Sequence, residues 1–223
     1  MAIAFDAVTA TSASCSVSSK TITHTCTGSD RILFAMVMNH TAHGTISGVT
    51  YNSVAMTKVT EYDDTAVRHT VWYLVAPDTG SAYNLTATCT VGTGCISIGA
   101  ISFTGASQTG QPDSYANATV TTTTSFTGTT TSVADNSFAV FNLRCASGAT
   151  LTGGTNTTIG SAPEVVAFGH AFAYSTAAQT PAGSFALNVT SANQLFSGLI
   201  VSFSPAGGGG GSFPRKALLG VGQ

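Results

Sequence analysis

Two halves of the chain repeat one order of short apolar segments, and this repeat constrains the fold more than any other feature of the sequence. Each later segment follows its counterpart by about 100 to 106 residues. The matched pairs are residues 28–37 with 134–141, 49–56 with 153–159, 69–73 with 170–174, 81–86 with 184–190, and 99–105 with 198–204. Self-similarity at a fixed spacing is typical of a duplicated structural unit. We therefore expect two similar halves, about 1–106 and 107–205.

The repeated segments have the composition of β-strands, because they are rich in β-branched and aromatic residues and are bounded by turn-forming residues. The 37 Thr, 25 Ser and 24 Gly residues of the chain suit strands and turns better than helix interiors. The most apolar segments, expected to be central strands, are residues 31–38, 67–75, 96–104, 136–143 and 196–203. The threonine-rich segment 119–131 is expected to be an exposed edge strand or a long crossing connection.

These patterns predict an all-β protein. We expect one double-sheet, jelly-roll-like β-sandwich built from the two halves and covering residues 1–205, because the short segment 105–113 between the halves does not resemble a hinge. Two independent sandwiches in tandem are the alternative.

Charge is scarce in this sequence and excludes some functions. Only 7% of the residues are charged and the formal net charge is −2, so we expect no nucleic-acid partner, which would need a basic surface. No apolar run approaches the ~18 residues of a membrane-spanning helix, so we expect no membrane partner. The first residues do not resemble a secretory signal, which favours a protein made in the cytoplasm or one that was trimmed.

The C-terminal end differs from the rest of the chain. Residues 206–212 include five consecutive glycines and are expected to be a flexible linker. Residues 213–223 are basic and apolar, as expected for a docking tail. The residues expected to bind a partner are Phe213, Pro214, Arg215, Lys216, Leu218, Leu219 and Val221.

Five cysteines leave the redox state open. Cross-hairpin pairing of Cys15 with Cys26, or of Cys89 with Cys95, is conceivable from their positions beside turn-like segments. The odd number, together with Cys145, and the missing signal favour reduced, buried thiols. The cysteine spacing does not match a zinc site.

Acidic residues offer weak candidates for catalysis or metal binding. Glu61 and Glu164 precede equivalent histidine-containing segments and could form a glycosidase pair if they converge in a cleft. Asp63 and Asp64 could supply oxygen ligands to calcium, although an acidic turn is the better interpretation. We expect no catalytic residues, no cofactor and no metal site.

Histidines and the single tryptophan are also interpreted as structural residues. His40 and His43 lack a third metal ligand, and His69 and His170 are expected to be core-edge residues that point the same way in equivalent strands. Trp72 could stack on a sugar, but its place in an apolar strand favours core packing.

Taken together, the segments IAFD at 3–6, ITHTC at 22–26, GSDRIL at 28–33, VTYN at 49–52, VWYLVAP at 71–77, GAISFTG at 99–105 and GLIVSF at 198–203 carry a family likeness. In them the chain resembles the roughly 200-residue β-sandwich modules of bacteriophage virion proteins and bacterial surface proteins. The resemblance covers nearly all of 1–205 and implies a jelly-roll-like structural or binding domain.

We therefore expect a non-enzymatic virion structural protein, of the capsid-decoration or head or tail fibre type, attached through its C-terminal tail. Its expected partners are other virion proteins and further copies of itself, and its expected location is the virion, after synthesis in the host cytoplasm. The alternative is a carbohydrate-binding or adhesive module of the bacterial cell surface, with a glycan bound by the loops around 40–48, 62–66 and 147–163, where Tyr62 is the aromatic residue.

Overall fold

The computed structural model describes residues 1–91, 94–165 and 168–207, without the side chain of His43. Strands and isolated bridges make up about 65% of the described residues. The strands of the first half are β1 (Ala4–Cys15), β2 (Ser19–His24), β3 (Ile32–His40), β4 (Ile46–Tyr51), β5 (Val54–Ala55), β6 (Thr57–Asp63), β7 (Val67–Val75), β8 (Tyr83–Cys89) and β9 (Cys95–Thr104), with a short 3-10 helix η1 (Thr41–His43). Those of the second half are β10 (Ser114–Thr131), β11 (Phe138–Arg144), β12 (Thr152–Gly153), β13 (Thr157–Ser161), β14 (His170–Ser175) and β15 (Ser184–Phe203).

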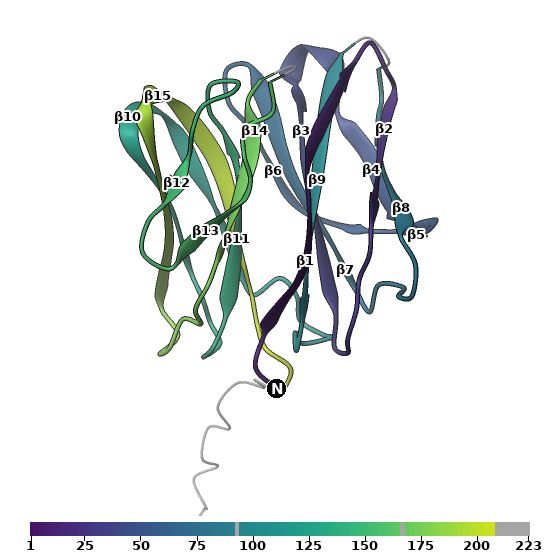
Figure 1. Cartoon of the computed structure of the whole chain (residues 1–223), viewed down its shortest axis with the longest axis vertical. Helices are drawn as coiled ribbons and strands as arrows, with labels where there is room; N and C mark the ends of the chain where they lie inside the picture. Colours follow the sequence, from purple (N-terminus) through teal and green to yellow (C-terminus); the bar gives the residue numbers. More distant parts are fainter. Residues whose placement is uncertain (92–93, 166–167, 208–223) are drawn as a thin grey trace, which may run out of the picture.

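These strands form three antiparallel sheets that pack on one another (Figure 1). The first half forms a four-stranded sheet, β2-β8-β4-β5, and a five-stranded sheet, β1-β9-β3-β7-β6. The second half forms one sheet in the order β10-β15-β11-β14-β13, with β12 beside β15. The all-β class with packed antiparallel sheets is therefore as the sequence predicts.

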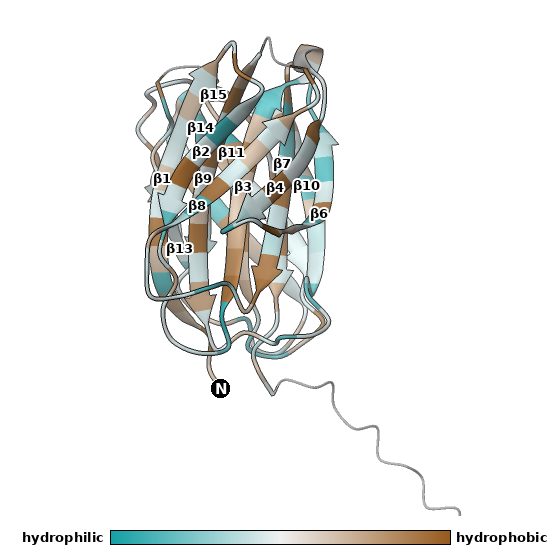
Figure 2. Ribbon diagram, turned by 90° about the vertical axis from the view of Figure 1, so that its right-hand side faces the viewer, coloured by the Kyte–Doolittle hydropathy of each residue, from teal (hydrophilic) through white to brown (hydrophobic). Residues whose placement is uncertain are grey.

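The five-stranded sheet lies in the middle of the molecule, and its inner strands β3 and β9 are buried on both faces. One face packs against β4 and β8 through residues such as Leu33, Val37 and Ile98. The other face packs against the second half through Phe34, Phe103 and their neighbours. Burial on both faces explains why β3 is apolar from Ile32 to Met38, as its hydropathy colouring in Figure 2 shows. β9 is equally buried but includes Ser97 and Ser102.

The five segments predicted as central strands correspond to β3, β7, β9, β11 and β15. Each of these strands has a neighbouring strand on both sides in its sheet. The threonine-rich segment is confirmed as an edge strand, β10, which is hydrogen-bonded in its sheet to β15.

Strands of the two halves do not interleave within a sheet. Outside the isolated bridge between Ala106 and Pro205, the described strands of each half pair with strands of the same half. Equivalent strands occupy equivalent positions, since β9-β3-β7 in the first half corresponds to β15-β11-β14 in the second. The halves are joined instead through the core between them, which includes Phe172 and Phe203 from the second half.

The halves differ where the chain passes from one layer to the next. In the second half, β10 and β15 continue through this region as strands of 18 and 20 residues. In the first half the corresponding strands are interrupted, so that β1 and β2, and also β8 and β9, are separate. The last paired residues of β1 and β9 are Cys15 and Cys95.

These two cysteines form a disulfide bond, which corrects the expectation that all cysteines are reduced. Neither of the two hairpin pairings considered from the sequence forms. Cys26, Cys89 and Cys145 are free and buried. Burial raises the pKa of each of these thiols, that of Cys145 to about 12, so they remain protonated and unreactive at neutral pH.

Replacing Cys15 and Cys95 together by Ser is expected to lower the free energy of unfolding by about 2–4 kcal/mol, because the bond closes a long loop of the unfolded chain. The sequence separation of the two cysteines is 80 residues. Urea denaturation measures the change. A reducing agent should weaken the original protein to the same extent and leave the variant unchanged; equal stability of variant and original protein would contradict this role.

Candidate functional site

The predicted docking residues lie outside the part of the chain that the structure describes. Phe213, Pro214, Arg215 and the other tail residues belong to the segment 208–223, and the linker 206–212 is described to Gly207. The tail therefore stays a prediction.

The most prominent polar cluster is buried between the two halves. Asn142 on β11 donates hydrogen bonds from Nδ2 to the carbonyl oxygens of Val37 (3.2 Å) and Thr70 (3.1 Å) in the first half. Its Oδ1 then accepts a hydrogen bond from Nε2 of His170, at 2.9 Å. Nδ1 of His170 is left to accept from the hydroxyl of Ser97 on β9, at 2.8 Å. All three side chains are fully buried.

A second histidine makes the reciprocal contact. His69 on β7 lies 2.9 Å from the hydroxyl of Ser197 on β15. That hydroxyl donates to Oδ2 of Asp64 at 2.5 Å, so Nε2 of His69 is the donor to Ser197 and its Nδ1 has no partner. Arg144 also reaches Asp64, with an Nη1 to Oδ2 distance of 3.1 Å. Each half thus supplies a histidine to a serine of the other half.

This cluster contains serine, histidine and aspartate, but its hydrogen bonds are donated in the wrong direction for a nucleophilic triad. In such a triad the serine donates to the histidine, and the histidine donates to the aspartate. Here Ser197 donates directly to Asp64, and His69 and Ser197 are fully buried. A second set of these residues within the first half has the same direction of donation: Ser102 donates to Asp6 (2.7 Å) and lies 3.0 Å from Nε2 of His24. These groups join layers and do not form a nucleophile.

Burial controls the protonation of these groups. Desolvation lowers the pKa of His24 to about 4, against a smaller opposing effect of Asp6. Desolvation, with a contribution from His69, lowers the pKa of His170 to about 3, and it also lowers the pKa of His69. Burial alone would raise the pKa of Asp64, but hydrogen bonds from His69, Ser197 and two backbone N–H groups bring it well below its usual range. The histidines are therefore neutral and Asp64 is ionised at neutral pH.

The two candidate catalytic glutamates have other contacts. Glu61 lies on β6 and pairs with Lys58 at 2.8 Å on the surface. Glu164 lies between β13 and β14, where its Oε1 accepts hydrogen bonds from the backbone N–H groups of Phe168 and Gly169. Both carboxylates thus bind groups of the chain itself.

The adjacent aspartates are engaged as well. Asp63 forms a two-point pair with Arg68, with distances of 2.6 Å, and Asp64 accepts from the backbone N–H groups of Ala66 and Val67. The acidic-turn interpretation of this pair is confirmed. Within the described ranges, no three His, Cys, Asp or Glu residues are grouped so that they could hold a metal ion.

Of the aromatic candidates for sugar stacking, Trp72 is buried and Tyr62 is half-buried. Trp72 is 7% exposed and belongs to the core between the first two sheets, which confirms core packing. Tyr62 stacks on His69 with ring centroids 5.8 Å apart. His40 lies edge-on to Phe168 at 4.9 Å.

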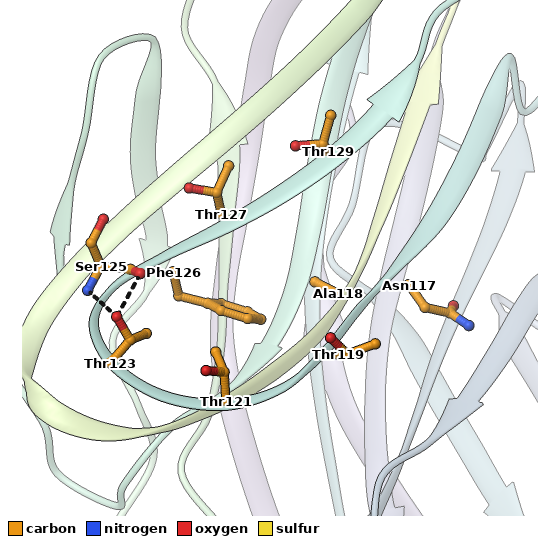
Figure 3. A pocket seen from close by; sticks show the side chains of 9 residues that line it. All are labelled: Asn117, Ala118, Thr119, Thr121, Thr123, Ser125, Phe126, Thr127 and Thr129. Atoms are coloured by element: carbon orange, nitrogen blue, oxygen red, sulfur yellow. Dashed lines mark hydrogen bonds between the residues drawn. The ribbon is translucent and has the colours of Figure 1, made fainter.

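An open groove lies where β10 bends from one layer to the next (Figure 3). Its volume is about 460 Å³. Figure 3 shows threonine side chains along the inside of the bend and the ring of Phe126 at its base. The lining residues are Asn117, Ala118, Thr119, Thr121, Thr123, Ser125, Phe126, Thr127 and Thr129. The groove is therefore uncharged and offers hydroxyl groups and one amide as hydrogen-bonding partners.

Sequence reasoning found His69 and His170 but missed their partners. Their hydrogen-bond partners are Ser97, Ser197 and Asn142 from other strands. The available signal was a polar residue inside each apolar segment of the repeat. That signal marks buried polar positions but not which of them meet.

Replacing Asn142 by the similarly sized Leu should lower the free energy of unfolding by about 3 kcal/mol or more, because it leaves buried polar groups of His170, Val37 and Thr70 without this partner. Asn117→Leu is the matched control, since Asn117 is exposed and should change stability by less than about 0.5 kcal/mol. Urea denaturation compares the two. Equal effects at both sites would contradict a special role of Asn142.

Stability should also fall as the pH drops from about 6.5 to about 4. The folded protein keeps His24 and His170 neutral because their pKa values are lowered to about 4 and about 3, whereas the unfolded chain takes up protons below about 6.5. Each histidine accounts for a loss on the order of 3 kcal/mol across this window. Urea midpoints measured from pH 8 to pH 4 test this, and a flat profile between pH 6.5 and 4.5 would contradict it.

None of the described residues forms a helix long and apolar enough to cross a membrane. No protein-family model, no curated protein and no solved structure matches this chain. The antiparallel sheets are compatible with the β-sandwich that the sequence resemblance implies.

Proposed function

We propose that this chain is a non-enzymatic structural protein of a bacteriophage virion, a capsid-decoration or head or tail fibre module that attaches through its C-terminal tail. The observation that supports this most directly is the position of the chain ends. The amino group of Met1 donates a hydrogen bond to the carbonyl oxygen of Ala206 at 2.7 Å, so both ends of the described body lie at one pole (Figure 1). The described body ends with Gly207 at this pole, so the proposed attachment begins here.

The body itself suits a passive, displayed module. Its serine, histidine and aspartate side chains are used to join layers, as described above. Its surface has few charges, so contacts with other proteins depend little on salt. The expected partners are other virion proteins, and the expected location is the virion.

A carbohydrate-binding or adhesive module of a bacterial surface is the second candidate, and the groove at the bend of β10 is the observation that favours it. Its neutral hydroxyl and amide groups are suitable partners for a glycan. The loops proposed from the sequence for this role offer less, because Tyr62 is stacked on His69.

Particle binding distinguishes the two proposals. The original chain and the full-length variant Leu218→Asp/Leu219→Asp are mixed with phage particles made without this protein, and the bound fraction is measured by sedimentation. A docking tail predicts at least about a tenfold loss of binding in the variant, because buried carboxylates oppose docking.

A second variant that ends at Ala206 should also fail to bind while keeping the circular dichroism spectrum of a folded β-protein, since the described cores lie before this residue. Unchanged binding by both variants would overturn attachment through the tail. If no form binds particles and the original chain binds on a glycan array, the second candidate replaces the first.

A further inference from the structure

We infer that the edge of β10 is an interface at which a second copy of this chain adds its own β10, so that a sheet continues from one molecule into the next. The inference concerns self-association and does not depend on the proposed attachment through the tail. It begins from the exposed edge of an unusually long strand.

β10 has 18 residues and stands at the end of its sheet. Within the described ranges, its ladder partner is β15 alone. An edge strand has a row of N–H and C=O groups that point away from its one neighbour and are free to bind another strand. The last seven residues, Ser125–Thr131, pair with β15 without a register shift and therefore present an edge with a regular hydrogen-bonding pattern.

Other edges of the molecule have features that oppose pairing. β6 carries Lys58, Glu61 and Asp63, and β2 carries Lys20. β5 and β13 have two and five residues. β1 is covered by neighbouring strands, since Thr11 bonds to Ser161 at 2.9 Å. Charge, shortness and cover are the usual protections of a sheet edge, and Ser125–Thr131 has none of them.

The chemistry of this segment favours a copy of itself as the partner. A two-fold axis places a strand antiparallel to its own copy, so any charged residue near the axis would face a like charge. No residue of β10 is charged, and its threonines would face threonines, which form favourable cross-strand pairs. Thr127, Thr129 and Thr131 are exposed, whereas Phe126, Gly128 and Thr130 are buried. The strand can therefore gain a neighbour without losing its packing.

The test is the mass of the full chain in solution, measured by light scattering and sedimentation velocity over a range of concentrations. We expect a dimer that dissociates on dilution. The variant Thr129→Lys/Thr131→Lys should weaken dimerisation at least about tenfold, because like charges then face each other across the axis. Both threonines are exposed and their side chains make no hydrogen bond in the described structure, so folding should be preserved.

A charge-swap experiment locates the interface. The variant Thr129→Glu/Thr131→Glu should also be monomeric, and mixing it with the Lys variant should restore a dimer that contains one copy of each. Thr23→Lys/Thr88→Lys is the matched control, because both threonines are exposed on the sheet of β2 and β8. This control should dimerise like the original chain.

Three results would overturn the inference: a monomer at every concentration, a dimer that survives both charged variants, or charged variants that do not recombine when mixed. All variants keep the tail unchanged. Loss of dimerisation and loss of particle binding are therefore measured separately, and failure of one proposal leaves the other standing.

Discussion

The structure depends on the contact between the two halves, in which hydrogen bonds and apolar packing alternate along the same strands. β9 and β15 each present a serine and then apolar residues to this interface, with Ser97 and Ser197 followed by Phe103 and Phe203. The apolar part supplies most of the driving force, because it removes large side chains from water. The polar part fixes the relative position of the halves, because Asn142 and the two histidines have partners in one arrangement only.

Duplication explains both the symmetry of this contact and where it is broken. Reciprocal histidine–serine pairs follow naturally when two copies of one unit pack through the same face. The two copies differ in how the chain passes between layers. In the first half the strands are interrupted and a disulfide joins Cys15 to Cys95, whereas in the second half β10 and β15 are long and continuous. The continuous strands create the bent, uncharged edge of β10 and the groove beside it. The groove and the exposed edge of β10 thus follow from the way the two copies of the repeat differ.

The sequence predicted the strands well because strand formation depends mainly on residues that are close together in the sequence. Apolar runs bounded by turn residues indicated β3, β7, β9, β11 and β15, and threonine content indicated the edge strand β10. Contacts between strands that are distant in the sequence could not be predicted from local patterns. For this reason the Cys15–Cys95 bond and the partners of His170 were missed. Burial on both faces of the central sheet also depends on a third layer, which the alternation within one strand does not reveal. The tail lies outside the described residues and stays a sequence prediction.

The central claim is that the two halves form one cooperative unit through their buried contact. Differential scanning calorimetry of the full chain tests it most directly, because it compares the measured enthalpy of unfolding with the van't Hoff enthalpy. The account predicts a single transition in which the two enthalpies agree. Two separable transitions, each with about half of the total enthalpy, would show that the halves unfold independently and would contradict the account.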